Sequence, residues 1–417
     1  MAIFRVTEQF LSFYKSKGAK ILSSAPLIHP LFPMSFNMSA GLVQLDHLLR
    51  SKNIIQNKKM VVVQKCFRHF DVSKVTDYSH LSFFEMGGYF EIGNFSKKTS
   101  MKYIFNLLVN EYQIDPSKLW VTYFSGDTIF RKQFPIEKEM LDFWRKLLPS
   151  KNQIIGFNKK HNFWVQGGGT EIAVESKLCG PQIEIFYDLG NKGCKKEHCL
   201  PNCECGRFLE ISNNLFITHK ITSELKVQPL LNKAVESVIG IERVCAVIEN
   251  QSSVFEIEEI AHLTNLLQTN DNTKKEIQKR KNRIADHVRA LCFLIPEGAP
   301  LPGRSGRARI IRTLIRGLLT DLYTLDLNSS EKIKQLISEI ILTYQFRYPN
   351  LHVKEKQIFK MILDHEKIYL KSLNKAKNAI MRYLEKNNKN QLDETEKEFF
   401  RKQFGIPFEL QERYINL

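Results

Sequence analysis

The sequence contains no apolar run long enough for a membrane helix, and its N-terminus lacks the apolar core of a secretory signal. We therefore expect a protein of the cytosol with no membrane partner. It also lacks the phosphate-binding loop of kinases and ATPases, because Gly167-Gly168-Gly169-Thr170 is not followed by the required lysine. The Gly-x-Ser-x-Gly and His-Glu-x-x-His patterns of common hydrolases are missing too. A nucleotide site must then be built from other residues.

Acidic residues are too few to balance the basic ones. The sequence has 61 Lys and Arg against 44 Asp and Glu, which gives a formal net charge of +17. This excess favours a polyanionic partner such as nucleic acid or a nucleotide. A bias toward lysine and asparagine codons would produce the same excess, so both interpretations stay open.

The 417 residues, 43% of them hydrophobic, suffice for two or three globular domains. Helical spacing predicts helices over residues 1–20, 101–114 and 137–148, whereas β-rich runs between 21 and 95 predict antiparallel sheet. Further strands are predicted over 119–124 and 183–188. Beyond about residue 250 the strand patterns end, and the apolar spacing predicts helices over 255–268, 274–295, 307–324, 331–346 and 354–386. The pattern indicates an α+β fold with a first domain over 1–250 and an all-helical domain over 251–417.

Basic residues concentrate in the helical half. Residues 271–320 contain twelve Lys and Arg but four acids, and Arg309, Arg312 and Arg316 share one helical face. That face either contacts phosphates or is the solvated side of a core helix.

Four of the eight cysteines fall within twelve residues, at positions 194, 199, 203 and 205. In a reducing compartment, such a cluster suits tetrahedral Zn²⁺ better than a disulfide framework, with His198 as an alternative ligand. Ordinary free thiols are the other interpretation. The remaining cysteines are expected to pack as small apolar residues.

Several segments occur in an order that is typical of one enzyme family. They are Gln64-Lys65-Cys66-Phe67-Arg68, His80-Leu81-Ser82-Phe83-Phe84-Glu85-Met86, Cys179-Gly180-Pro181-Gln182-Ile183-Glu184, Phe208-Leu209-Glu210-Ile211-Ser212-Asn213, Gly240-Ile241-Glu242-Arg243, Ala285-Asp286-His287-Val288-Arg289 and Phe404-Gly405-Ile406-Pro407. Together they resemble the alanyl-tRNA synthetases, which are class II aminoacyl-tRNA synthetases. The resemblance implies an antiparallel sheet flanked by helices, followed by a helical tRNA-recognition domain.

The resemblance also implies the chemistry: ATP and Mg²⁺ convert an amino acid to its adenylate, and the acyl group passes to the 3′ end of tRNA. It makes Arg68 and Arg243 the catalytic arginines, because guanidinium groups offset the repulsion between a carboxylate and a triphosphate. The residues it implies for ATP binding are Arg68, His80, Phe84, Met86, Glu184 and Arg243.

For the amino-acid pocket the resemblance implies Trp164 as a wall, Asn213 as a polar contact and an acidic group for the substrate ammonium. Here the sequence departs from the family, which has Asp where Glu236 stands and Gly where Val238 stands. Glu236 keeps the charge, but Val238 adds three carbons to a cavity for a methyl group, at a cost of roughly 1–3 kcal/mol. Alanine is thus the expected substrate, with another small amino acid left open.

The resemblance further implies contacts with the tRNA acceptor stem. The candidate residues are Arg304, Arg307, Arg309, Arg312, Arg316 and Lys402. The family reads a G·U pair with an Asn and an Asp, which the matching segments here do not hold. We therefore expect stronger phosphate contact and weaker base discrimination.

We expect no editing domain after Phe404-Gly405-Ile406-Pro407, and a monomer rather than a dimer. Three functions stay open at this point. They are a compact alanyl-tRNA synthetase-like ligase, a paralogue with another amino acid or acceptor, for instance in natural-product or resistance chemistry, and a non-catalytic tRNA-binding module.

Overall fold

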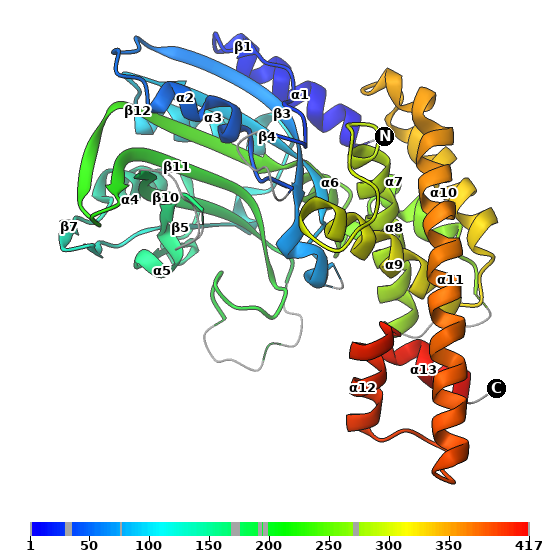
Figure 1. Ribbon diagram of the computed structural model, residues 1–417. Coiled ribbons are helices and arrows are strands. Elements are labelled where there is room, and N and C mark those ends of the chain that lie inside the picture. The colour runs from blue at the N-terminus through cyan, green and yellow to red at the C-terminus, as the bar shows by residue number, and fades with distance from the viewer. Residues whose placement is uncertain are drawn as a thin grey trace. The chain divides into compact units, whose positions relative to one another are not determined.

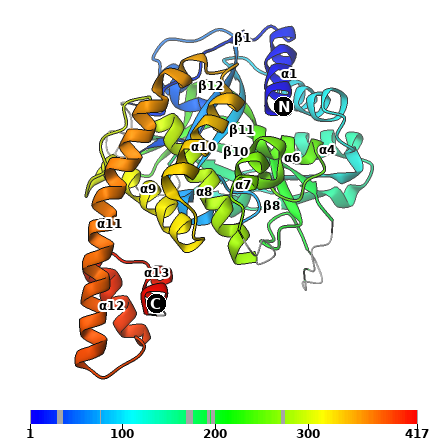
Figure 2. The same ribbon diagram turned by 90° about the vertical axis from the view of Figure 1, so that its right-hand side faces the viewer.

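The computed structural model describes residues 2–29, 36–75, 77–167, 176–190, 194, 199–269 and 275–415. The chain divides into two compact units (Figures 1 and 2). The first comprises Met1–Ala25, Met38–Cys66 and Phe84–Ile257; the second comprises Pro26–Asn37, Phe67–Phe83 and Glu258–Leu417. Two short segments of the N-terminal half therefore share a unit with the C-terminal helices.

A ten-stranded sheet forms the first unit, with its main strands in the order β1-β3-β4-β12-β11-β10-β5-β8. The strands are β1 Lys20–Ile21, β2 Asn37–Met38, β3 Lys58–Arg68, β4 Phe83–Ile92, β5 Leu119–Phe124, β8 Ile154–Phe157, β9 Phe163–Val165, β10 Ser176–Asp188, β11 Phe208–Thr222 and β12 Val227–Gly240, and β6 Asp127–Ile129 pairs with β7 Lys132–Phe134 in a separate hairpin. From β4 through β12, β11 and β10 to β5 the pairing is antiparallel, whereas β1 with β3 and β5 with β8 are parallel. The predicted antiparallel sheet is thus confirmed, with parallel strands at its edges.

An irregularity in β10 sets the register of the central strands. The pairing with β11 shifts between Cys179 and Gln182. A Cβ atom at Gly180 would lie 1.9 Å from the carbonyl oxygen of Phe216, so no larger residue fits there. Pro181, which has no N–H to donate, lies in the same irregular stretch. Beyond it the regular register places Glu184 opposite Asn213.

The helices of the first unit are α1 Ala2–Ser16, α2 Asp46–Leu49, α3 Lys97–Asn106, α4 Lys138–Leu147, α5 Lys159–Asn162 and α6 Ile241–Ile248. The N-terminal helix predicted over 1–20 is confirmed as α1, and its Tyr14 ring stacks on Tyr89 of β4 at 4.3 Å. Helix α3 continues as a π-helical turn over Leu107–Glu111. The strand-rich interpretation of 21–95 missed α2, where Arg50 binds Asp46 one turn earlier.

The second unit is mainly helical (Figure 2). Its helices are α7 Glu258–Asn265, α8 Lys275–Leu294, α9 Gly306–Thr324, α10 Ser329–Tyr344, α11 Glu355–Lys386, α12 Glu394–Phe404 and α13 Phe408–Ile415. The five long apolar patterns predicted beyond residue 250 all correspond to helices. Helices α8 and α9 are joined by a buried ion-pair group in which Arg280 and Arg283 both bind Asp321. Among the described residues, no helix combines the length and apolar character needed to cross a bilayer.

Candidate active site

A chain of hydrogen-bonded polar side chains connects α6 to β11 and β10 in the first unit. Arg243 of α6 donates from Nη1 to the Glu210 carbonyl oxygen at 3.0 Å and to the Glu210 carboxylate at 3.2 Å. Asn213 donates from Nδ2 to Glu210 at 3.3 Å and to Glu184 at 3.4 Å. Three predicted site residues, Arg243, Asn213 and Glu184, are thus brought together through Glu210.

The Glu184 carboxylate is the inner end of this polar chain. It accepts hydrogen bonds from Thr122 Oγ1 at 3.2 Å and from Gln182 Nε2 at 3.0 Å. Asn162 supports the first of these by donating to Thr122 at 2.9 Å. Burial, followed by the nearby Glu210 carboxylate, raises the pKa of Glu184 well above its usual range. The site therefore favours a proton or a cation between the two carboxylates.

An apolar cluster lies beside the polar chain. Val238, Met86 and Cys66 are buried together, and Phe84 packs against them. The strand register places Val238 opposite Asn213 on one side and Gly88 on the other. Two predicted ATP-binding residues, Phe84 and Met86, therefore meet the predicted pocket residue Val238.

The other two predicted pocket residues lie near a different apolar cluster. Glu236 is 2% exposed and is paired in the sheet with Leu215 and Phe90. These two residues belong to the cluster against which Trp164 of β9 packs. Trp164 is therefore in a different cluster from Val238.

Arg68 and His80 belong to the second unit, whereas Arg243 belongs to the first. Arg68 ends β3, and its backbone N–H donates to the Ser82 carbonyl oxygen at 2.9 Å. The His80 ring binds the Asp77 carboxylate. Burial alone would raise the pKa of Asp77, but hydrogen bonds from the His80 ring and from two backbone N–H groups outweigh it and lower that pKa.

Helix α8 holds the segment that carries Arg68 and His80. Asp286 accepts hydrogen bonds from the Ser82 backbone N–H at 2.7 Å and the Ser82 hydroxyl at 2.5 Å. The Arg289 guanidinium lies 5.5 Å from the Phe83 ring centroid and donates to the Tyr344 hydroxyl at 2.8 Å. The helix itself was predicted over 274–295, but its role in positioning this segment was not. The sequence signal for this role is the pair of charged residues Asp286 and Arg289, three positions apart in a mainly apolar helical stretch.

The basic face predicted on α9 is only partly solvated. Arg309 is exposed, whereas Arg312 and Arg316 are partly buried. The Arg316 guanidinium lies 4.9 Å from the ring centroid of Tyr369 on α11. Buried His365 lies one turn before Tyr369, and burial, with Arg316 and Arg312, lowers its pKa to about 4. The structure thus brings two predicted arginines together with a neutral histidine.

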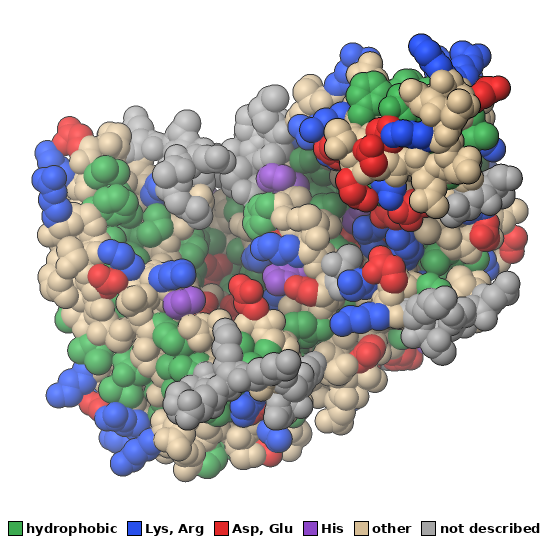
Figure 3. Space-filling view, turned by 90° about the horizontal axis from the view of Figure 1, so that it is seen from below, with side chains coloured by type: hydrophobic (Ala, Val, Ile, Leu, Met, Phe, Trp, Pro, Cys, Tyr) green, Lys and Arg blue, Asp and Glu red, His purple; other side chains and the backbone are tan. Residues whose placement is uncertain are grey.

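The other predicted tRNA-binding residues make separate contacts. Arg307 donates to the His29 carbonyl oxygen at 3.0 Å, Arg304 is exposed, and Lys402 pairs with Glu398 at 3.2 Å. A Cβ at Gly405 would lie 3.5 Å from Arg316 Nη1, so the end of α12 approaches α9. On the face drawn in Figure 3, the described Lys and Arg side chains are scattered, with acidic side chains among them. The basic excess is therefore dispersed on that face.

The cysteine cluster lies in the connection between β10 and β11. The Sγ atoms of Cys194, Cys199, Cys203 and Cys205 all lie within 4.8 Å of one another. His198, the alternative ligand, lies outside the described residues.

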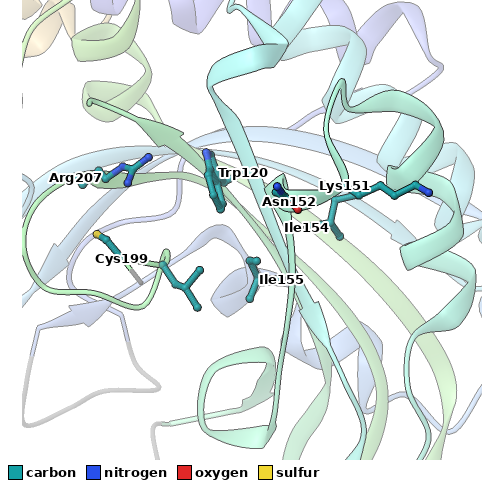
Figure 4. A pocket seen from close by; sticks show the side chains of 8 residues that line it. Trp120, Lys151, Asn152, Ile154, Ile155, Cys199 and Arg207 are labelled. Atoms are coloured by element: carbon teal, nitrogen blue, oxygen red, sulfur yellow. The ribbon is translucent and has the colours of Figure 1, made fainter. Parts of the chain in front are cut away.

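A cavity of 440 Å³ opens beside this cluster (Figure 4). Its lining residues are Trp120, Lys151, Asn152, Ile154, Ile155, Cys199, Leu200 and Arg207. Cys199 is the one predicted site residue in this lining, so the cavity is distinct from the residues predicted to bind ATP and the amino acid.

Comparison with known proteins shows the family to which the chain belongs. The family model for class II tRNA synthetases (A) matches residues 5–416, which is nearly the whole chain. The chain belongs to this family. The curated alanine–tRNA ligase of Elusimicrobium minutum is 32% identical over 412 residues, which is 97% of this chain and 45% of that protein. The alanine–tRNA ligase of Treponema denticola is 32% identical over 76% of this chain and 52% of its own length.

The synthetase-family chain thus spans about half the length of these curated relatives. A solved structure of histidyl-tRNA synthetase from S. aureus covers 63% of this chain and 75% of its own, with 13% identity and a TM-score of 0.35. That likeness is too distant to support an argument.

Proposed function

We propose that this chain activates a small amino acid with ATP and transfers it to the 3′ end of a tRNA, with alanine as the expected amino acid. The observation that carries the proposal is the polar chain from Arg243 through Glu210 and Asn213 to Glu184, beside the apolar cluster of Phe84, Met86 and Val238. It offers charged groups for a triphosphate next to apolar surface for a base. Family membership provides the reaction class.

In the proposed first step, the amino-acid carboxylate attacks the α-phosphate of ATP. An oxygen–phosphorus bond forms to give the adenylate, and the bond to the leaving pyrophosphate breaks. Both reactants are anions, so fixed guanidinium groups lower the barrier by balancing their charge. We assign this role to Arg68 and Arg243. Glu210 holds the Arg243 guanidinium by two contacts and so limits its freedom before ATP binds.

The residues present fit the Mg²⁺ that accompanies ATP. Glu184 and Glu210 are bonded to the same Asn213 amide, and burial, followed by the proximity of the Glu210 carboxylate, raises the pKa of Glu184. Oxygen ligands of this kind suit Mg²⁺, which would neutralise charge on the phosphates. Arg243 partly offsets the negative charge of Glu210 and orients it.

The pocket residues favour a second candidate, a paralogue that activates a different amino acid. Buried Glu236 is the proposed partner of the substrate ammonium. Val238 is 7% exposed and already packs against Met86, so its isopropyl group occupies space that glycine would leave open. This packing favours a substrate placed differently from the family's alanine.

For the second step, we assign tRNA contact to the arginines of α9, with Arg304, Arg307 and Lys402 as further candidates. Among the described side chains, no acid pairs with Arg309, Arg312 or Arg316. Arg309 and Arg312 are available to backbone phosphates, whereas Arg316 packs on the Tyr369 ring.

The test is amino-acid-dependent exchange of pyrophosphate into ATP, measured for each of the twenty amino acids, followed by charging of total tRNA. Exchange with alanine and charging of alanine tRNA would support the proposal. Exchange with another amino acid, or without charging, would favour the paralogue. No exchange with any amino acid would contradict both and leave a non-catalytic tRNA-binding module.

A further inference from the structure

The four cysteines between β10 and β11 are not used by the proposed aminoacylation chemistry. They come from a connection whose described residues form turns and bends rather than helix or strand. Cys194 lies 3.7 Å from Cys203, and Cys199 lies 3.4 Å from Cys205, measured between Sγ atoms. All four sulfurs lie within 4.8 Å of one another, so the cluster is one tetrad rather than two separate pairs.

This spacing matches one metal ion. Four sulfurs at the usual zinc–sulfur distance of about 2.3 Å form a tetrahedron with edges of about 3.8 Å. The two short pairs, at 3.7 and 3.4 Å, lie just below that edge. A small contraction of the remaining pairs would complete the site.

We propose that Cys194, Cys199, Cys203 and Cys205 bind one zinc ion as four thiolates. Soft sulfur ligands select zinc over Mg²⁺ or Ca²⁺, and a tetrahedral four-sulfur site takes zinc or iron. With all four positions filled by protein, the ion has no open position for substrate, and the site is structural. The inference does not depend on the aminoacylation proposal.

Neighbouring contacts show what the ion would stabilise. Arg207 donates to the two carboxylate oxygens of Asp188 at 2.9 and 2.6 Å, and so ties the end of β10 to the start of β11. Its guanidinium also lies 4.7 Å from the Phe208 ring centroid. These contacts join the two strands at the base of the connection, and the zinc would cross-link Cys194 to Cys199, Cys203 and Cys205 within it.

The proposed zinc site lies next to the cavity and to the start of β11. Cys199 and Leu200 both line the 440 Å³ cavity, and Figure 4 shows Cys199 across from Trp120 and Ile155. Arg207 immediately precedes β11, which carries Glu210 and Asn213. Zinc would therefore hold one cavity wall and the entry to this strand.

The first experiment measures metal in the purified full chain by mass spectrometry of the elements, after exhaustive dialysis. We expect about one zinc per chain. The Cys203→Ser variant should lose at least about nine-tenths of it, because three thiolates and a hydroxyl bind zinc far more weakly. Cys179→Ala is the matched control, since Cys179 is buried in β10 outside the tetrad, and it should keep its zinc.

A second measurement covers the case in which the serine variant does not fold. Cobalt(II) is added to the wild-type chain after removal of metal with a chelator, and the absorption spectrum is recorded. Intense thiolate-to-cobalt bands and tetrahedral cobalt bands are expected, with loss of cobalt on addition of zinc. A wild-type chain without bound zinc or tetrahedral cobalt, a Cys203→Ser variant that keeps full zinc, iron in place of zinc, or disulfides in the tetrad would each overturn the proposal.

Discussion

The two units present their positive charges in different ways. In the first unit, Arg243 is held by Glu210, and Glu210 is bonded through Asn213 to Glu184. In the second unit, Arg309, Arg312 and Arg316 lie on α9, and no described acidic side chain pairs with them, although Arg316 packs on the Tyr369 ring. Charges with built-in partners suit a small ligand that must be held in one geometry. Charges without them suit a polyanion that provides the counter-charge itself.

Within the second unit, the arginines of α8 bind other side chains and so serve the structure. Arg280 and Arg283 of α8 both bind buried Asp321, and Arg289 stacks on Phe83 and Tyr344. These residues stabilise the helices and the segment before β4. The basic excess of residues 271–320 therefore overstates the charge that is available to a partner.

The largest expected effect is on the paired charges of the first unit. Arg243→Ala removes a fixed positive group from the proposed triphosphate site, and we expect amino-acid-dependent pyrophosphate exchange to fall by roughly 10²–10³-fold. Affinity for tRNA, measured by filter binding, should stay unchanged. Arg145→Ala, at an exposed position on α4, is the control. Equal exchange in the two variants would contradict the role of Arg243.

The second largest effect is expected from changes in the amino-acid pocket. Val238→Gly combined with Glu236→Asp removes three carbons and shortens the acidic arm. We expect kcat/KM for alanine in the exchange assay to rise by about ten- to a hundredfold. Val238→Ala should give an intermediate value. An unchanged substrate profile in the double variant would contradict the proposal that Val238 and Glu236 determine which amino acid is activated.

A smaller effect is expected on the unpaired charges of the second unit. Arg312→Ala should raise the KM for tRNA by about tenfold and reduce the salt dependence of tRNA binding, because one phosphate contact is lost. Exchange without tRNA should not change. Arg382→Ala, exposed on α11, provides the comparison. A loss of pyrophosphate exchange in Arg312→Ala would contradict the assignment of Arg312 to tRNA binding.

The smallest effect concerns pH. The pKa of His365 is about 4 in the folded chain against an ordinary value of 6.5, so the unfolded chain binds more protons between these values. Stability should be constant above pH 6.5 and fall by about 1–2 kcal/mol as the pH drops to 4. The pKa of His219 is also lowered to about 4, so His219 likewise lowers the stability of the folded chain as the pH falls. His365→Gln should flatten part of this dependence in urea unfolding; an unchanged pH profile would contradict the assignment.

The sequence predicts the long helices well because their apolar residues recur with helical spacing over many turns. Strand β10 is longer than the predicted 183–188, because it begins at Ser176. Gly180 within it is required by the close approach of Phe216 from β11. Local pattern contains no information about such a contact.

The candidate site, too, could be predicted only in part from the sequence. The motifs located Arg243, Asn213 and Glu184, but not that Glu210 would link them. The inclusion of 67–83 in the helical unit depends on bonds such as Ser82 to Asp286, 204 residues apart. Pairings across this separation are set by tertiary structure, which no short motif encodes.

The proposed activity requires Arg243, held by Glu210 in the first unit, to act on bound ATP. The most direct test is a crystal structure of the full chain with ATP and Mg²⁺. We expect the Arg243 guanidinium to lie within hydrogen-bonding distance of phosphate oxygens, with Phe84 against the base. A bound nucleotide from which the Arg243 guanidinium points away would contradict the proposal.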